Sequence, residues 1–158
     1  MRPIPAIAWG AMTVGSFDLL DGIVFYWLRY RVTPLRILHS IASGLLGRRA
    51  FAGGLATAAL GFGLHFFIAT GIVVTFYLVS RRLRFLTTRP FAYGAMYGLI
   101  VYAVMNGVVL PLSAAAHGFP PFLVLVNGLL IHIFGVGIPT AVFVSAIETP
   151  ASTSPVAR

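Results

Sequence analysis

Two carboxylates interrupt the first apolar stretch of the chain, which reads GSFDLLDGIVFYW over residues 15–27. Asp18 and Asp21 are two of only three acidic residues among 158, and their neighbours are mostly apolar. A charged group inside a bilayer is costly, so it faces the interior of a helix bundle or pairs with a partner. The stretch therefore predicts a membrane-spanning helix with one polar side that faces inward.

The overall composition predicts an integral membrane protein. Apolar residues make up 59% of the chain and charged residues only 9%, with a mean hydropathy of +0.96, whereas soluble domains carry about 25% charged residues. All eleven basic residues are arginine. They lie at the ends of the apolar segments, which indicates membrane topology and lipid contact and not a nucleic-acid surface. The lack of cysteine excludes disulfides and thiolate sites.

Four apolar segments are long enough to cross a bilayer, which needs about 20 residues. They cover residues 4–28, 53–79, 91–112 and 121–146. Backbone polar groups in lipid need partners within their own segment, so we expect helices. The expected fold is an all-α four-helix membrane bundle over residues 1–147, followed over 148–158 by a disordered tail rich in Pro, Ser and Thr.

A shorter helix is expected between the first two spans, over residues 34–46. Thr33 and Pro34 form a typical helix start, and apolar residues then recur at helical spacing. This segment is too short to span, which favours an amphipathic helix in the membrane interface or a short re-entrant helix. The arginines around it are candidates for binding anionic lipid headgroups, with ordinary interface anchoring as the simpler alternative. They are Arg29, Arg31, Arg36, Arg48 and Arg49.

The arginine distribution barely decides the orientation of the chain. With four spans, the side that holds both termini carries six arginines and the opposite side carries five. We expect a multi-pass protein of the bacterial inner membrane with both termini in the cytoplasm.

In each span the polar residues share a face with the small residues. Small residues let membrane helices approach closely, and polar groups turn away from lipid, so both rules select the same face. We expect the four faces to meet in one interior that holds a polar cluster. Helical rise places Asp18 and two histidines near mid-membrane, with the other members one or two turns nearer the first and third connections. The cluster consists of Asp18, Asp21, His65, Asn106, Asn127 and His132.

Three functions are compatible with this cluster. The leading prediction is a packing or interaction protein, either a homo-oligomer or a small subunit of a larger membrane complex, whose Gly-rich faces contact itself or other membrane proteins. The alternative is a proton-linked channel or transporter that uses Asp18, Asp21, His65 and His132. A second alternative is binding of haem b by the two histidines, or of a divalent metal ion by the two histidines together with the two aspartates. No catalytic motif is present, so we expect no enzyme, no resident metal and otherwise no cofactor.

Two stretches in the second half of the chain carry a resemblance to known proteins. They are RPFAYGAMYGLIVYAVMNGVVLPLSAAAHGFPPF (89–122) and NGLLIHIFGVGIP (127–139), and SIASGLLG (40–47) is a further similar feature. In these stretches the chain resembles small, functionally uncharacterised bacterial inner-membrane proteins of the YagU-like group. The resemblance implies a multi-pass protein with cytoplasmic termini. It implies no activity, so no functional residue is transferred from the group.

Overall fold

The computed structural model describes residues 3–116 and 118–148, and every regular element in this part of the chain is a helix. Four helical stretches are long and apolar enough to cross a membrane. They are α1 (Pro3–Tyr30), α3 (Gly54–Ser80), the run from α4 (Pro90–Val104) to α5 (Leu110–Leu112), and the run from α6 (Phe122–Ile131) to α7 (Ile138–Glu148). The all-α fold is confirmed, with bounds within two residues of those expected. Of the tail predicted over 148–158, Glu148 ends α7 and residues 149–158 lie outside the described residues.

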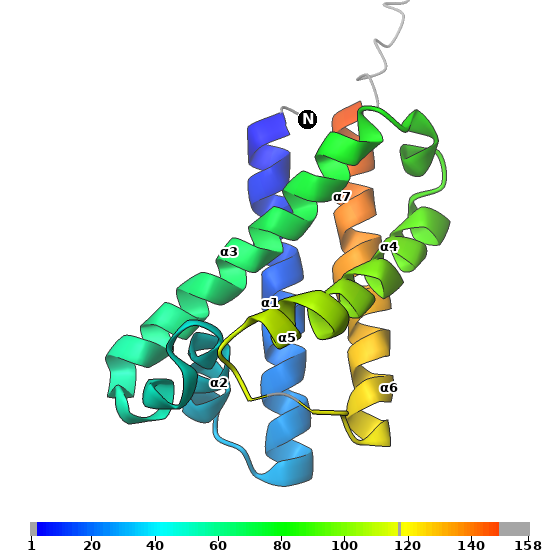
Figure 1. Ribbon diagram of the computed structural model, residues 1–158. Coiled ribbons are helices and arrows are strands. Elements are labelled where there is room, and N and C mark those ends of the chain that lie inside the picture. Colours follow the sequence, from blue (N-terminus) through cyan, green and yellow to red (C-terminus); the bar gives the residue numbers. More distant parts are fainter. Residues whose placement is uncertain (1–2, 117, 149–158) are drawn as a thin grey trace, which may run out of the picture.

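The long helices alternate in direction, so the connections gather at two ends (Figure 1). The start of α1, residues 81–89 and the end of α7 lie at one end, here called the terminal end. Residues 31–53 and the link from α5 to α6 lie at the other, here called the connection end. Helix α1 contacts both α3 and α7, while α4 packs against the α6–α7 run.

An apolar layer fills the half of the molecule nearer the terminal end. Its side chains come from all four long helical stretches and are each at most 7% exposed. Close packing of this kind leaves few voids between the helices. The apolar layer consists of Val14, Val73, Phe76, Val101, Val136 and Val144.

Glycines bring α4 into backbone contact with the α6–α7 run. A Cβ atom on Gly98 would collide with the carbonyl of His132, and one on Gly137 would collide with the carbonyl of Gly94. Side chains at these positions would push the two helices apart, as expected for small residues at helix crossings in membranes. The predicted meeting of glycine faces is therefore observed here within a single chain.

Helix α2 (Pro34–Leu46) has the predicted bounds, and the Thr33 hydroxyl caps it by accepting from the backbone N–H of Arg36 at 3.3 Å. It lies along the first half of α3, a contact that the sequence did not predict. Its place in the membrane interface stays a prediction. A Cβ atom on Gly61 of α3 would collide with the carbonyl of Leu38. This part of the α3 small-residue face therefore contacts α2 and not the interior shared by the long helices.

His39 also joins α2 to α3. Its imidazole is 6% exposed, and its Nε2 donates to the carbonyl of Gly54 at 2.8 Å. Two 3₁₀ segments, η1 (Gly47–Ala52) and η2 (Arg84–Thr87), complete the connections at the two ends.

Two π-helical segments interrupt the long helices, and each is followed closely by a proline. Segment η3 (Met105–Val109) precedes Pro111, and η4 (His132–Gly137) precedes Pro139. Proline lacks an N–H and crowds the carbonyl four residues earlier. After each segment, the backbone N–H bonds a carbonyl five residues back and not four. These wider turns were not predicted, and π-helical turns are frequent at functional sites.

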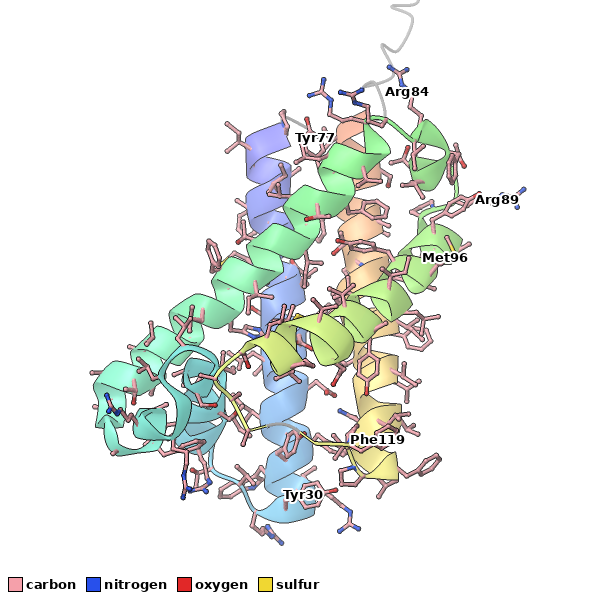
Figure 2. The ribbon with its side chains drawn as sticks, in the orientation of Figure 1. Tyr30, Tyr77, Arg84, Arg89, Met96 and Phe119 are labelled. Atoms are coloured by element: carbon pink, nitrogen blue, oxygen red, sulfur yellow. The ribbon has the colours of Figure 1, made fainter. Side chains whose placement is uncertain are left out.

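Large apolar side chains cover the outside of the long helices. Leu55, Phe67 and Phe122 are each at least 76% exposed, and Figure 2 shows side chains projecting outward along the helices. Tyr77 and Arg84 lie at the terminal end, and Tyr30 at the connection end (Figure 2). Soluble monomers rarely expose contiguous apolar surface on this scale, so the outer surface suits contact with lipid.

Candidate functional site

A cavity with space for about 310 Å³ of water-sized molecules lies between α1, α2, α3, α4 and α6, and is here called the outer cavity. Its lining includes Tyr26 and Pro120 near the connection end and extends to residues midway along the helices. The topology thus brings polar residues from four separate helical stretches to one space. All six members of the predicted polar cluster line it: Asp18, Asp21, His65, Asn106, Asn127 and His132.

A second cavity of about 60 Å³, here called the inner cavity, lies deeper in the molecule. Apart from Asp18, His65 and His132, the residues that line it are apolar and include Ile72 of α3. The two cavities share Asp18, His65, Met105 and His132. One carboxyl group and two imidazoles therefore mark the boundary between an open polar space and a small apolar one.

His65 joins α3 to α1 at this boundary. Its Nε2 lies 2.8 Å from the carbonyl oxygen of Gly15 and 4.0 Å from Oδ2 of Asp18. A carbonyl only accepts, so Nε2 carries the hydrogen, and Nδ1 of the neutral ring is an acceptor. The His65 and Asp18 side chains are 12% and 30% exposed, so this contact is partly shielded from solvent.

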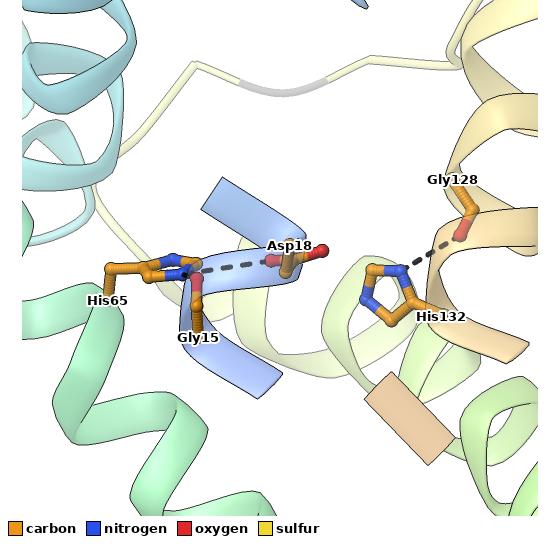
Figure 3. Close-up of polar contacts among 5 residues, drawn as sticks. All are labelled: Gly15, Asp18, His65, Gly128 and His132. Carbon is orange, nitrogen blue, oxygen red and sulfur yellow. Dashed lines mark hydrogen bonds and ion pairs between the residues drawn. The ribbon is translucent and has the colours of Figure 1, made fainter. Parts of the chain in front are cut away.

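His132 lies across from His65 and belongs to η4. Its Nδ1 donates to the carbonyl of Gly128 at 2.9 Å, which leaves Nε2 of the neutral ring as an acceptor. The ring meets that of Tyr102 edge-on, with centroids 5.2 Å apart. Figure 3 shows Asp18 between the two histidines, as the predicted mid-membrane group required.

The second predicted group is only partly assembled. Asn127 Nδ2 of α6 donates to Oδ2 of Asp21 of α1 at 2.6 Å, so these two residues meet as expected. Asn106 does not join them: its side chain is exposed and Nδ2 donates to the carbonyl of Tyr102 in its own helix at 2.9 Å. Asn106 lies in the widened π turn, whose effect on the direction of side chains the α-helical spacing did not include.

The contacts of the two histidines do not favour axial ligation of haem iron by this pair. Nε2 of His65 already bonds Gly15, and Asp18 lies between the rings (Figure 3). Within residues 3–116 and 118–148, no three His, Asp, Glu or Cys side chains gather closely enough to hold a metal ion. Haem or metal binding stays a prediction without added support.

The five arginines near the connection end are exposed, as lipid contact requires. The guanidinium of Arg36 lies 5.2 Å from the ring centre of Phe51, and that of Arg29 lies 5.5 Å from the ring centre of Tyr30. Their binding of anionic headgroups stays a prediction.

Sequence reasoning missed part of the cavity wall. Phe25 and Tyr26 line the outer cavity, and the sequence did not predict a part for them in it. Tyr102 lines the cavity too, from the face of the third span that it shares with Asn106, one helical turn away. His39 and the role of the prolines gave no comparable signal.

No family model, no curated protein and no solved structure matches this chain. The resemblance to the YagU-like group therefore stays a prediction.

Proposed function

We propose that the chain is a multi-pass protein of the bacterial inner membrane, with both termini in the cytoplasm. Four helices of sufficient length and the large apolar side chains on their outer surface support insertion. Arginines beyond the helix ends, such as Arg31 and Arg89, suit the headgroup region. In this orientation the outer cavity opens to the periplasmic side.

We infer that this membrane protein functions in proton-linked transport through Asp18, His65 and His132. The observation that carries the proposal is their position at the boundary shared by the two cavities. Ionisable side chains at this depth are typical of proton relays, and imidazole changes charge in the physiological pH range. The group can receive protons from the outer cavity and release them towards the inner one.

The hydrogen bonds of the two histidines define the route of a proton. Uptake at Nδ1 of His65 gives an imidazolium whose Nε2–H is held by the Gly15 carbonyl at 2.8 Å and lies 4.0 Å from the Asp18 carboxylate. Transfer to Asp18 therefore requires the bond to Gly15 to be released. Asp18 in turn has His132 on its other side, with the Nε2 acceptor not used by Gly128 (Figure 3). The carboxyl group thus stands between one proton donor and one proton acceptor.

The apolar layer makes this a gated pathway. Beyond the inner cavity the helices are close-packed through Val73, Phe76 and Val144, and these side chains are at most 2% exposed. A proton needs water or polar groups to move, so it crosses only when this layer opens. The arrangement favours a transporter or gated channel over a permanently open pore.

The structure gives less support to the interaction-protein hypothesis. Gly94, Gly98 and Gly137 contact one another inside the chain, so they are not available for association with a partner. Gly63 and Gly71 have open space beside them. Association through these positions stays a prediction, and it does not require the polar cavity.

Proton flux into liposomes tests the proposal. The protein is reconstituted with an internal pH dye, and a pH step is applied with valinomycin and potassium to neutralise charge. We expect flux above that of empty vesicles for the wild type and loss of this excess in Asp18→Asn. Thr70→Val is the matched control, because Thr70 is exposed on α3 and bonds only the Phe66 carbonyl. Wild-type flux equal to that of empty vesicles would overturn the proposal.

A further inference from the structure

The outer cavity is larger than proton transfer alone requires. It holds about 310 Å³, roughly ten times the volume per molecule in liquid water, whereas a proton moves along a single file of water. This volume falls within the range of small-molecule sites, about 300–1,000 Å³. We propose that the outer cavity binds a small organic cation of the alkylammonium class. This inference rests on the proposed function to the extent that both use Asp18.

The charge of the cavity wall selects a cation. Asp18 and Asp21 are the carboxylates that line it, and no arginine is part of the lining. The other titratable groups that face the space are His65, His132 and the phenols of two tyrosines. In a chain with a formal net charge of +8, two of the three acidic residues thus face one cavity. Walls of low polarity strengthen the attraction of these carboxylates for a positive ligand.

Asp18 has unused hydrogen-bonding capacity. No hydrogen bond to its carboxylate is found among the described residues, and His65 Nε2 lies 4.0 Å from Oδ2. Asp21, by contrast, accepts from Asn127 at 2.6 Å. The Asp18 side chain is 30% exposed and lines the cavity, so its oxygens are open to whatever occupies that space. An ammonium group bound there would form a charge-assisted hydrogen bond with this carboxylate.

Aromatic rings form another part of the wall and suit the alkyl groups of such a cation. Phe25 and Tyr26 of α1 meet edge to face, with ring centroids 5.4 Å apart, and Tyr102 lines the cavity from α4. Aromatic faces attract alkylammonium ions through the ring quadrupole. Carboxylates and rings in one space favour an organic cation over an anion, which the carboxylates would repel. They also favour an organic cation over a bare metal ion, which has no alkyl groups to contact the rings.

Calorimetry in detergent with choline as the probe tests the proposal, and 3,3-dimethylbutan-1-ol, its uncharged carbon isostere, serves as the control ligand. We expect choline to bind at least about tenfold more tightly than the isostere, because only the cation is attracted electrostatically by the carboxylates and by the aromatic rings. Asp18→Asn should weaken choline binding by about tenfold and Tyr26→Leu by about threefold, while Thr70→Val leaves it unchanged. Equal binding of choline and the isostere, or full affinity in both variants, would overturn the proposal.

The two proposals can fail separately. Proton flux that depends on Asp18, together with no choline binding, removes the cation site and leaves proton transport. Choline binding without proton flux removes proton transport and leaves the cation site. If both are correct, choline added from the connection side should reduce the proton flux, because it occupies the space through which protons reach Asp18.

Discussion

Asn127 and Asp21, 106 residues apart in sequence, are joined by a hydrogen bond of 2.6 Å from the amide Nδ2 to the carboxylate Oδ2. This bond links α1 to α6 within the outer cavity. The hydrogen bonds of His65, Asn106 and His132, by contrast, end on backbone carbonyls. Its partners therefore allow a direct test of how much a side-chain pair contributes to helix association.

We predict that Asn127→Leu lowers the free energy of unfolding in detergent by about 0.6–1.7 kcal/mol, the range for side-chain hydrogen bonds between membrane helices. Asn106→Leu is the matched control and should cost less, since Asn106 bonds its own helix at an exposed position. The exchanged pair Asp21→Asn with Asn127→Asp should recover most of the loss, because the amide and carboxylate can still bond. Equal losses for Asn127→Leu and Asn106→Leu would contradict the interhelical role.

A second prediction concerns the crossing of α4 and η4. Gly98→Ala should destabilise the protein by about 1–3 kcal/mol, because the added methyl group collides with the backbone carbonyl of His132, which cannot move alone. Gly107→Ala in the same span has open space beside it and should be neutral or slightly stabilising. Thermal unfolding of the two variants in one detergent measures the difference. A stable Gly98→Ala protein would show that the helices do not meet here.

Docking of α2 on α3 can be tested by proteolysis. Gly61→Leu should release α2, because Gly61 faces the Leu38 carbonyl. Gly63→Leu is the control and should leave α2 in place, because Gly63 has open space beside it. Trypsin cuts after arginine, and the exposed Arg48 and Arg49 follow α2 directly. We expect cleavage at this pair to be at least about tenfold faster in Gly61→Leu than in Gly63→Leu. Equal rates would place α2 away from α3.

Water access to the outer cavity can be tested because the chain has no cysteine. Gly22→Cys adds a thiol to the cavity wall in open space, and Gly63→Cys adds one on the outer surface of α3. Both positions lie roughly 12–14 Å from the connection end of their helix. In vesicles a water-soluble maleimide should label the Gly22→Cys variant and leave the Gly63→Cys variant largely unlabelled, since thiolates do not form in lipid. Labelling of both variants, or of neither, would contradict a water-filled cavity.

The five arginines near the connection end give a prediction about lipid. Replacing all five by glutamine should reduce the amount of phosphatidylglycerol that co-purifies with the protein, with each arginine contributing about 1 kcal/mol near a charged surface. Phosphatidylcholine retention is the control and should not change. An unchanged phosphatidylglycerol content would leave these residues as simple interface anchors. The residues are Arg29, Arg31, Arg36, Arg48 and Arg49.

The helices were predictable because one rule governs apolar segments that are about 20 residues long. A backbone that is shielded from water must form its hydrogen bonds within its own helix. The first residue of α2 was also predicted correctly, because Thr33 and Pro34 are typical of a helix start. The pairing of Asp21 with Asn127 also followed from spacing, since polar and small residues share one face of each span. These features depend on local sequence and on a single general preference.

The remaining features depend on tertiary contacts that a helical wheel does not contain. The π turns before Pro111 and Pro139 change the direction of neighbouring side chains, and so Asn106 left its expected group. The contact of Gly61 with α2 arises because a short helix competes with the long helices for the same small-residue face. The volume of the outer cavity depends on how all of these elements pack together.

The asymmetry between the outer cavity and the apolar layer has an electrical consequence. In the proposed orientation, if water fills the cavity as far as Asp18, the periplasmic solution extends about halfway through the bilayer. The membrane voltage then falls mainly across the layer around Val73 and Phe76. A unit charge that crosses the full potential gains about 2.3 kcal/mol per 100 mV. Nearly all of that work would be done over the short distance between Asp18 and the cytoplasmic surface. The opening of a few valine and phenylalanine contacts would then be the step most sensitive to the energised state of the membrane.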